Sequence, residues 1–197
     1  LSAIVISIVA ITNYSKKNKQ MLSDLMIKKF IESGDIGISP EIKIEGSSVD
    51  LTLSNVFKKL DSPIIDIKDP KTFIYTEIKA DELIIAPGEF ILAATNEFIK
   101  LSDKVSAFVQ GRSSLGRLGL AVEIAGFCDA GFQGTITLEI FNTSNRPLKI
   151  YKDTKICQIM FFRMDGKVET PYGKKHSAKY QGQIKPEGSK IYQETKV

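Results

Sequence analysis

Hydrophobic and polar positions follow two different periods along this chain, and the first has helical spacing. Ser23 or Asp24 can cap a helix, and Gly34 can end it. The apolar positions at helical spacing between them are Leu25, Met26, Phe30 and Ile31. The pattern predicts one short helix near the N-terminus.

After this helix the period changes to two, which is typical of β-strands. The strand-like runs are 49–53, 90–93, 105–109, 135–141, 148–151 and 156–162. Turn signals separate them, at Pro63, Pro70, Pro87-Gly88, Gly134 and Asn145-Arg146-Pro147. Many short strands joined by short turns predict a mainly β fold: a β-sandwich, a jelly roll or a small barrel.

Both ends of the chain depart from this pattern. Residues 1–12 are apolar and are followed by lysines, but a helix of twelve residues is too short to cross a bilayer, and a signal peptide carries its charge before the apolar run. We interpret residues 1–20 as an extension outside the fold, with a natural start at Met21; the stump of a membrane anchor is the alternative. Residues 166–197 have little apolar periodicity. The expected organisation is therefore a β domain over 21–165 and a C-terminal arm over 166–197.

Composition narrows the class of protein. The chain has 197 residues, of which 43% are hydrophobic and 25% charged, as in a soluble globular domain. The net charge of +4 is too small to indicate binding to nucleic acid or a membrane. It is unevenly spread, because residues 146–197 hold 12 Lys/Arg against 5 Asp/Glu. This last quarter can neutralise an anion.

Few cysteines and histidines are present, which disfavours several kinds of site. Cys128, Cys157 and His176 are the only ones, so the sequence offers neither a disulfide framework nor a Cys/His zinc site. We expect both cysteines to be buried in a protein of the reducing cytoplasm. His176 lies in a polar stretch, where an exposed loop position is favoured over a catalytic one.

The stretch 111–120 joins a predicted strand to a glycine-flanked turn. It reads Gly-Arg-Ser-Ser-Leu-Gly-Arg-Leu-Gly-Leu, and the turn after the strand can point free N–H groups outward beside Arg112 and Arg117. This arrangement is a candidate phosphate site. It is not a Walker A loop, because Arg117 and Leu118 stand where that motif has Lys and Ser/Thr. An ordinary capped turn remains the alternative.

The next stretch places acids beside a predicted strand. Alternation puts Ile136, Leu138 and Ile140 on one face, and Thr135, Thr137 and Glu139 on the other. Glu139 therefore points to solvent or to a pocket. Asp129 lies nearby in sequence, and Gly131 and Gly134 can let a ligand approach closely. A solvated surface acid is the alternative.

The stretch 172–183 alternates lysines with tyrosines and amides, so it can donate many hydrogen bonds to an anion. Its composition also suits nonspecific RNA binding or a solubilising tail.

Seven motifs follow one another along the chain: Met-Leu-Ser-Asp at 21–24, Ser-Val-Asp-Leu at 48–51, Pro-Gly-Glu-Phe at 87–90, the turn at 111–120, Asp-Ala-Gly-Phe at 129–132, Thr-Leu-Glu at 137–139 and Ala-Lys-Tyr-Gln-Gly-Gln at 178–183. In this order they resemble the dCTP deaminase branch of the trimeric dUTPase-like family. The resemblance implies a distorted β-barrel or jelly-roll homotrimer with active sites between subunits. It also implies Mg²⁺ bound through the nucleotide triphosphate. From the small net charge and the few cysteines and histidines we expect no zinc, no nucleic acid partner and no membrane partner.

The implied activity is hydrolytic deamination of dCTP to dUTP and ammonia. Glu139 would be the general base, and Ser113 and Arg117 would hold the water and Glu139 in line. The matching substrate-binding residues are Arg112, Ser113, Ser114, Leu115, Gly116, Arg117, Asp129, Thr137, Leu138, Glu139, Gln158, Tyr172, Lys179 and Gln183. Asp129 would accept from the deoxyribose hydroxyl. The triphosphate would be held by Arg112, Ser114, Tyr172, Lys179 and Gln183, with Gln158 also contacting it.

Three points stay open at this stage. The tail at 179–183 is similar to dUMP-forming members, which also hydrolyse dUTP to dUMP and pyrophosphate, so the chain has one activity or two. The segment 121–124 lacks a histidine that many relatives carry, which leaves regulation by dTTP open. A plain dUTPase and a catalytically silent nucleotide-binding trimer are the rival interpretations.

Overall fold

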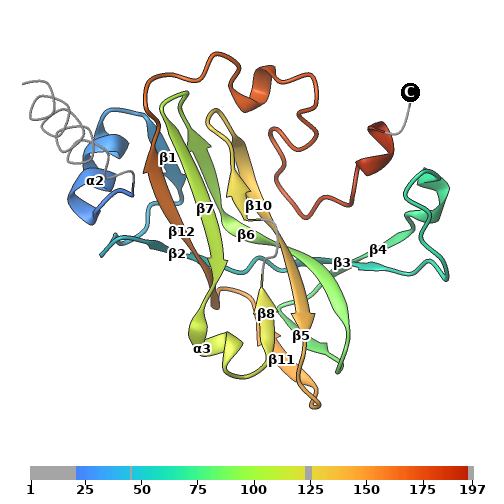
Figure 1. The fold of residues 1–197 in the computed structure, drawn as a ribbon. Helices are drawn as coiled ribbons and strands as arrows, with labels where there is room; N and C mark the ends of the chain where they lie inside the picture. Colours follow the sequence, from blue (N-terminus) through green and yellow to red (C-terminus); the bar gives the residue numbers. More distant parts are fainter. Residues whose placement is uncertain (1–20, 45, 123–125, 195–197) are drawn as a thin grey trace, which may run out of the picture.

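The computed structural model describes residues 21–44, 46–122 and 126–194. The expectation for residues 1–20 lies outside these described residues. The described chain is mainly β, as predicted, with one nine-residue helix, α2 (Asp24–Glu32) (Figure 1). A second helix, α3 (Ser113–Gly116), adds a single turn within the glycine-flanked stretch.

Twelve strands are described, and they include all six of the predicted runs. Their bounds are β1 (Ile36–Ser39), β2 (Val49–Thr52), β3 (Val56–Leu60), β4 (Tyr75–Lys79), β5 (Glu82–Ile85), β6 (Phe90–Leu101), β7 (Val105–Gly111), β8 (Leu120–Val122), β9 (Phe127–Cys128), β10 (Gln133–Asn142), β11 (Leu148–Tyr151) and β12 (Lys155–Arg163). The prediction missed β1, β3, β4, β5, β8 and β9.

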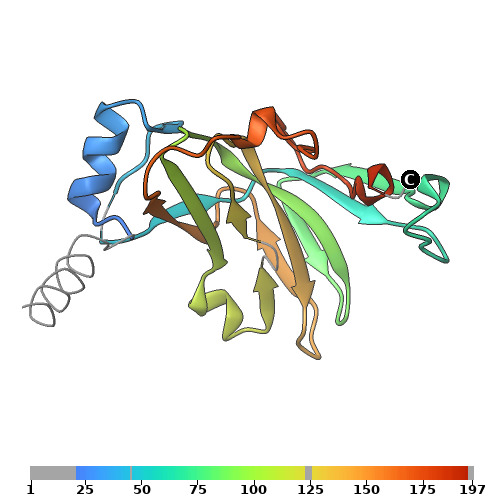
Figure 2. The ribbon, with the colours of Figure 1, turned by 45° about the horizontal axis from the view of Figure 1, so that its top comes forward.

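The strands form open sheets in the described part of the chain. The largest runs in the order β4-β3-β6-β10-β8, with β1 also paired to β6. A four-stranded sheet has the order β2-β12-β7-β9, and β11 pairs with β5. In Figures 1 and 2 the short strand β9, which pairs with β7, lies between β7 and β10 of the two larger sheets. A closed barrel and a homotrimer stay predictions.

The apolar core fills the space between the sheets. Phe57, Phe161 and Leu138 are among its largest fully buried side chains. Both cysteines are buried and His176 is exposed, as expected. Within the described ranges, no helix has the length and apolar character needed to cross a membrane.

The predicted inner face of the first helix was partly wrong. Ile27 is its fully buried residue, whereas Leu25 is 67% exposed. Asp24 stabilises the first turn locally, because its Oδ1 accepts a hydrogen bond from the Leu25 N–H at 2.8 Å. Met26, Phe30 and Ile31 pack partly buried against the core.

The tail after β12 crosses the edges of both sheets and ends beside the β3–β4 hairpin (Figure 1). It contains two short 3₁₀ helices, η2 (Tyr172–Lys174) and η3 (Ile191–Gln193). Main-chain hydrogen bonds fasten it to the domain, from Tyr172 N–H to the Ala130 carbonyl at 2.8 Å and from Thr135 N–H to the Gln183 carbonyl at 2.9 Å. The tail therefore packs on the strand that carries Glu139.

Candidate active site

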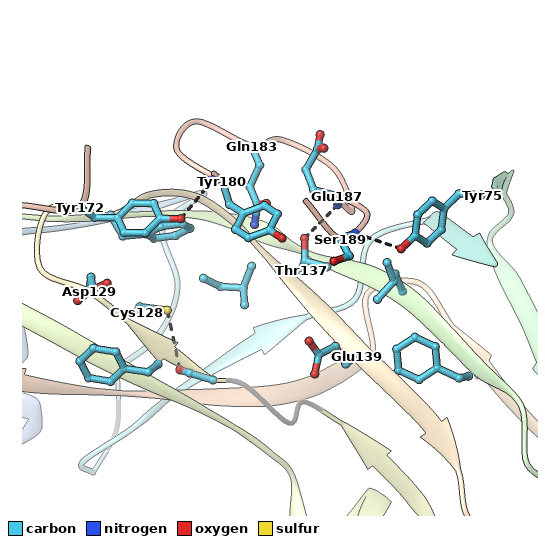
Figure 3. A pocket seen from close by; sticks show the side chains of 16 residues that line it. Tyr75, Cys128, Asp129, Thr137, Glu139, Tyr172, Tyr180, Gln183, Glu187 and Ser189 are labelled. Carbon is cyan, nitrogen blue, oxygen red and sulfur yellow. Dashed lines mark hydrogen bonds between the residues drawn. The ribbon is translucent and has the colours of Figure 1, made fainter. Parts of the chain in front are cut away.

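A cavity of about 370 Å³ lies under the tail (Figure 3). Its walls come from β4, the start of β6, β9 with the residues after it, β10 and the tail itself. The lining side chains include Tyr75, Phe90, Asp129, Thr137, Glu139, Tyr172, Tyr180, Gln183, Glu187 and Ser189. Segments far apart in the sequence thus meet at one concave site.

Strand β10 places Thr137 and Glu139 on the pocket side, as the alternation predicted. Leu138 and Ile140 are fully buried on the opposite face. Because the Leu138 side chain is in the core, only its main chain can meet a ligand. The pattern breaks at Thr135 and Ile136, where β10 shifts register against β6. Thr135 is 6% exposed because the tail covers it, and Ile136, expected on the opposite face, lines the pocket.

The Glu139 carboxylate has no hydrogen-bond or ion-pair partner among the described residues, although it lines the pocket. The other two pocket acids are paired. Asp129 accepts from Lys175 Nζ at 2.7 Å, and Glu187 lies 3.4 Å from Lys190 Nζ. Glu139 is therefore the pocket carboxylate left available to take a proton from a ligand or a water.

Tyrosines of the tail form the roof of the pocket. The Tyr172 ring packs edge-on against Phe132 at 5.7 Å between centroids, and its hydroxyl accepts from the Tyr180 N–H at 3.2 Å. Tyr180 in turn accepts from the Lys190 N–H at 3.1 Å. Each hydroxyl keeps its own hydrogen for donation.

The glycines at 131 and 134 allow a close approach, but the segment that approaches them is the chain's own tail and not a ligand. A Cβ on Gly131 would lie 2.5 Å from Pro171 Cβ, and one on Gly134 would lie 3.0 Å from Gln183 Cγ. The chain's own C-terminal segment therefore occupies the space that these glycines leave open.

Gln183 holds an unusual position at the pocket. Its Nε2 donates to the Thr135 carbonyl at 2.7 Å, while its buried Oε1 has no partner among the described groups. Leaving a buried acceptor unpaired is costly, so this oxygen favours a ligand donor. Contact with phosphate would use the second hydrogen of Nε2.

Lys179 does not line the pocket in this arrangement. Its ammonium pairs with Glu194, and its side chain is only 13% exposed.

The far end of the tail docks on β4, which sequence reasoning missed as a strand and as part of the site. Tyr75 lines the pocket, and its hydroxyl accepts from the Ser189 N–H at 3.1 Å. Lys185 pairs with Glu77 at 2.8 Å, and this hydrogen bond holds the pKa of Glu77 below its ordinary value. Glu187 and Ser189 were missed too, because nothing in the tail's sequence shows where it docks.

The predicted phosphate turn lies at the end of β7, outside this pocket. Ser113, Ser114, Gly116 and Arg117 are exposed there, whereas Leu115 packs half-buried against the core. The first N–H groups of α3 have no partner within its own turn, as in any helix start. Arg112 pairs with Asp50 at 3.2 Å, and Ser48 Oγ donates to Gln158 Oε1 at 3.2 Å.

Apart from Leu138 and Lys179, the predicted site residues therefore fall into two groups on one chain. The pocket group consists of Asp129, Thr137, Glu139, Tyr172 and Gln183. The turn group consists of Arg112, Ser113, Ser114, Leu115, Gly116, Arg117 and Gln158, none of which lines the described pocket. Among the described residues, no group of three or more His, Cys, Asp or Glu is placed to hold a metal ion.

Fold and site together define a β-sheet protein with an acidic pocket under its own C-terminal tail. The sequence profile of the dCTP deaminase-like family matches residues 21–164, so the chain belongs to that family. It is 47% identical over 179 residues to "dCTP deaminase, dUMP-forming" of Sulfurihydrogenibium sp., covering 87% of this chain and 97% of the relative. It is 46% identical over 181 residues to the protein of the same name from Persephonella marina, covering 87% and 97%.

The fold also matches a solved structure, that of 2'-deoxycytidine 5'-triphosphate deaminase from Agrobacterium tumefaciens. The TM-score is 0.59 at 19% identity, over 74% of this chain. The match spans 48% of the Agrobacterium chain, about half its length.

Proposed function

We propose that this protein, an enzyme of the dCTP deaminase family, converts dCTP to dUTP and ammonia and hydrolyses dUTP to dUMP and pyrophosphate. The observation that carries the proposal is Glu139, a carboxylate on the pocket face of β10 with no partner among the described residues. Curated relatives that match over almost their whole length bear the name of the dUMP-forming activity.

Deamination adds water to C4 of the cytosine and expels the 4-amino group. Glu139 takes a proton from the attacking water and passes it to the departing nitrogen, so that ammonia leaves and the carboxylate is restored. A general base of this kind contributes about 10²- to 10⁴-fold. Ser113 and Arg117 hold the water and Glu139 in line.

The remaining residues hold the nucleotide. Asp129 accepts from the deoxyribose hydroxyl, and Thr137 lies beside Glu139 on the same face of β10. The triphosphate is held by Arg112, Ser114, Gln158, Tyr172, Lys179 and Gln183. In this closed tail Lys179 is paired with Glu194, so its contact with phosphate requires that ion pair to open.

Mg²⁺ is proposed to arrive with the triphosphate. The turn group offers arginines, hydroxyls and an amide, which suit phosphate oxygens, and the described residues offer no carboxylate cage. When bound, the ion shields phosphate charge. We also propose a cytoplasmic location, because the two buried cysteines suit a reducing compartment.

A homotrimer would unite the two groups of site residues. Since the turn group does not line the pocket of its own chain, a neighbouring copy is needed to bring Ser113 and Arg117 to Glu139. Light scattering should then report about three times 21.8 kDa. Co-expression of Glu139→Gln with Arg117→Ala, each inactive alone, should restore activity at about a quarter of the sites if each site draws on two chains. No restored activity would contradict a shared site.

Product analysis tests the activity directly. Purified protein is incubated with dCTP and Mg²⁺, and dUTP, dUMP, ammonia and pyrophosphate are separated. Equal amounts of dUMP, ammonia and pyrophosphate support both steps, whereas accumulating dUTP shows deamination alone. Consumption of added dUTP but not of dCTP indicates a plain dUTPase. Binding without any product indicates a silent nucleotide-binding protein.

A further inference from the structure

A second polar cluster lies outside the pocket, on the four-stranded sheet where β7 leads into α3. Its centre is Asp50 of β2. Oδ1 of Asp50 lies 3.2 Å from Arg112 Nε, and Oδ2 lies 3.0 Å from Lys155 Nζ. The proposed function uses Arg112 for the triphosphate but assigns no part to Asp50.

The backbone fixes where the Asp50 side chain points. Val49 and Leu51, its neighbours on β2, are 1% and 0% exposed, so alternation turns Asp50 outward. Asp50 lies opposite Gln158 of β12, and Gln158 lies opposite Gln110 of β7. The three residues thus form one polar row across the sheet, above a buried apolar layer.

The ion pair holds Arg112 by one edge of its guanidinium. Nε faces Asp50, and within the described part of the chain Arg112 pairs with no residue other than Asp50. A guanidinium is planar and rigid, so fixing the Nε edge also fixes the direction of the Nη donors. Those donors can form a two-pronged contact with a phosphate.

Ser48 acts on Gln158 in a similar way. Its Oγ donates to Gln158 Oε1 at 3.2 Å, so the amide oxygen is occupied. The amide then presents its Nε2 donors, which suit an anion.

We propose that Asp50 and Ser48 are positioning residues that aim Arg112 and Gln158 at the phosphate groups of the nucleotide. The inference rests on the proposed function and deepens it. Neither residue needs to touch the substrate for this role.

Two effects of Asp50 on phosphate binding have opposite signs. As a negative charge near an anion site, Asp50 repels phosphate, and removing it should tighten binding. As the residue that holds Arg112, it favours binding, and removing it should weaken binding. The direction of the change therefore separates positioning from simple electrostatics.

The test uses the full chain and inorganic tripolyphosphate, with affinity measured by calorimetry. Asp50→Ala should weaken binding about tenfold and raise the KM for dCTP similarly, with a much smaller change in kcat. Asp50→Asn should restore most of the affinity, because its side-chain oxygen can still contact Nε of Arg112. Ser48→Ala should also weaken the binding of tripolyphosphate, even though Asp50 is intact in this variant. The matched control is Asp81→Asn, which removes an exposed acid that lies between β4 and β5 and pairs with Lys152 at 2.8 Å; it should change neither value.

Unchanged or tighter tripolyphosphate binding by Asp50→Ala would overturn the inference, as would an Asp50→Asn variant no better than Asp50→Ala. Equal losses of kcat and affinity in both Asp50 variants, with a lowered melting temperature, would also overturn it by indicating a structural role. If wild type binds tripolyphosphate but turns over no dCTP, the proposed function fails. The positioning role is then still tested by the affinities of the Asp50 and Ser48 variants for tripolyphosphate.

Discussion

The side-chain amide of Gln183 donates to the main-chain carbonyl of Thr135 at 2.7 Å, across 48 positions of sequence. This bond joins the tail to β10 two residues before Thr137 and four before Glu139. A parallel bridge between Gly134 and Gln183 adds main-chain pairing at the same point. These bonds fasten the tail to the strand that carries the candidate base, so removing the tail should affect the position of that base.

Truncation after Gly166 should spare the fold of the β domain and cripple turnover. The truncated chain keeps all twelve strands but loses Tyr172 and Gln183 from the pocket wall. We expect kcat/KM for dCTP to fall about 100-fold or more, because the reacting groups lose their positioning and their cover from water. Circular dichroism checks folding, and steady-state kinetics checks turnover. Unchanged kinetics with a lost RNA mobility shift would favour the solubilising or RNA-binding interpretation.

A smaller change at Gly131 should displace the tail without deleting it. Gly131 has φ +87°, and an added Cβ would lie 2.5 Å from Pro171 Cβ and 3.0 Å from Tyr172 N. We expect Gly131→Ala to raise the KM for dCTP and to expose the tail to limited proteolysis.

Gly166→Ala is the matched control. Gly166 has φ +91°, but nothing lies within 4 Å of its added Cβ. Both substitutions carry the left-handed strain of about 1–2 kcal/mol, and only Gly131→Ala adds the clash. Equal proteolysis of the two variants would contradict the importance of the close approach.

The sequence predicts strands well where one face is buried and the other is not. The runs that became β2, β10 and β12 alternate because they cover the core on one side. Strand β4 was not predicted because it extends beyond the core and shows no clear alternation. Its residues Thr76, Glu77 and Lys79 are all exposed. Helix α2 was predicted in place but with Leu25 inward, because apolar spacing alone does not tell which of Leu25 and Ile27 the sheet covers.

The site is predictable to the extent that it lies on regular elements. Alternation along β10 is enough to place Glu139 on the pocket face. The contribution of Tyr75 depends on where an irregular tail comes to rest, which no local pattern encodes. Whether Arg117 reaches the pocket of Glu139 depends on where the turn between β7 and β8 lies, and no local sequence pattern shows that.

Lowering the pH should destabilise the folded protein by protonating Glu89, which lies in the turn between β5 and β6. Burial acts to raise the pKa of Glu89, but hydrogen bonds from Lys59 and the Ala86 N–H, which lies 2.7 Å from Oε2, outweigh it and hold the pKa below the ordinary 4.5. A lowered folded-state pKa means that the stabilisation is present above pH 4.5 and is lost as the pH falls through the folded-state value.

Glu89→Gln should therefore lower the free energy of unfolding by about 1 kcal/mol at pH 7, and by less below pH 4. Urea denaturation at both values measures this. Glu82→Gln is the control, since Glu82 pairs with Lys149 at 2.7 Å but is 55% exposed and should cost little. A Glu89→Gln deficit that stays constant down to pH 3 would contradict the assignment.

The last prediction concerns the candidate base itself. Glu139→Gln keeps the size and shape of the side chain but cannot take a proton, so deamination should fall by about 10²- to 10⁴-fold or more while dCTP still binds. Because Asp129 and Glu187 are both ion-paired, neither is free to replace it. Calorimetry with dCTP separates binding from turnover, and Glu187→Gln serves as the control because it changes another pocket carboxylate. Ammonia release near the wild-type rate from Glu139→Gln, or an equal loss from Glu187→Gln, would remove Glu139 from its proposed role.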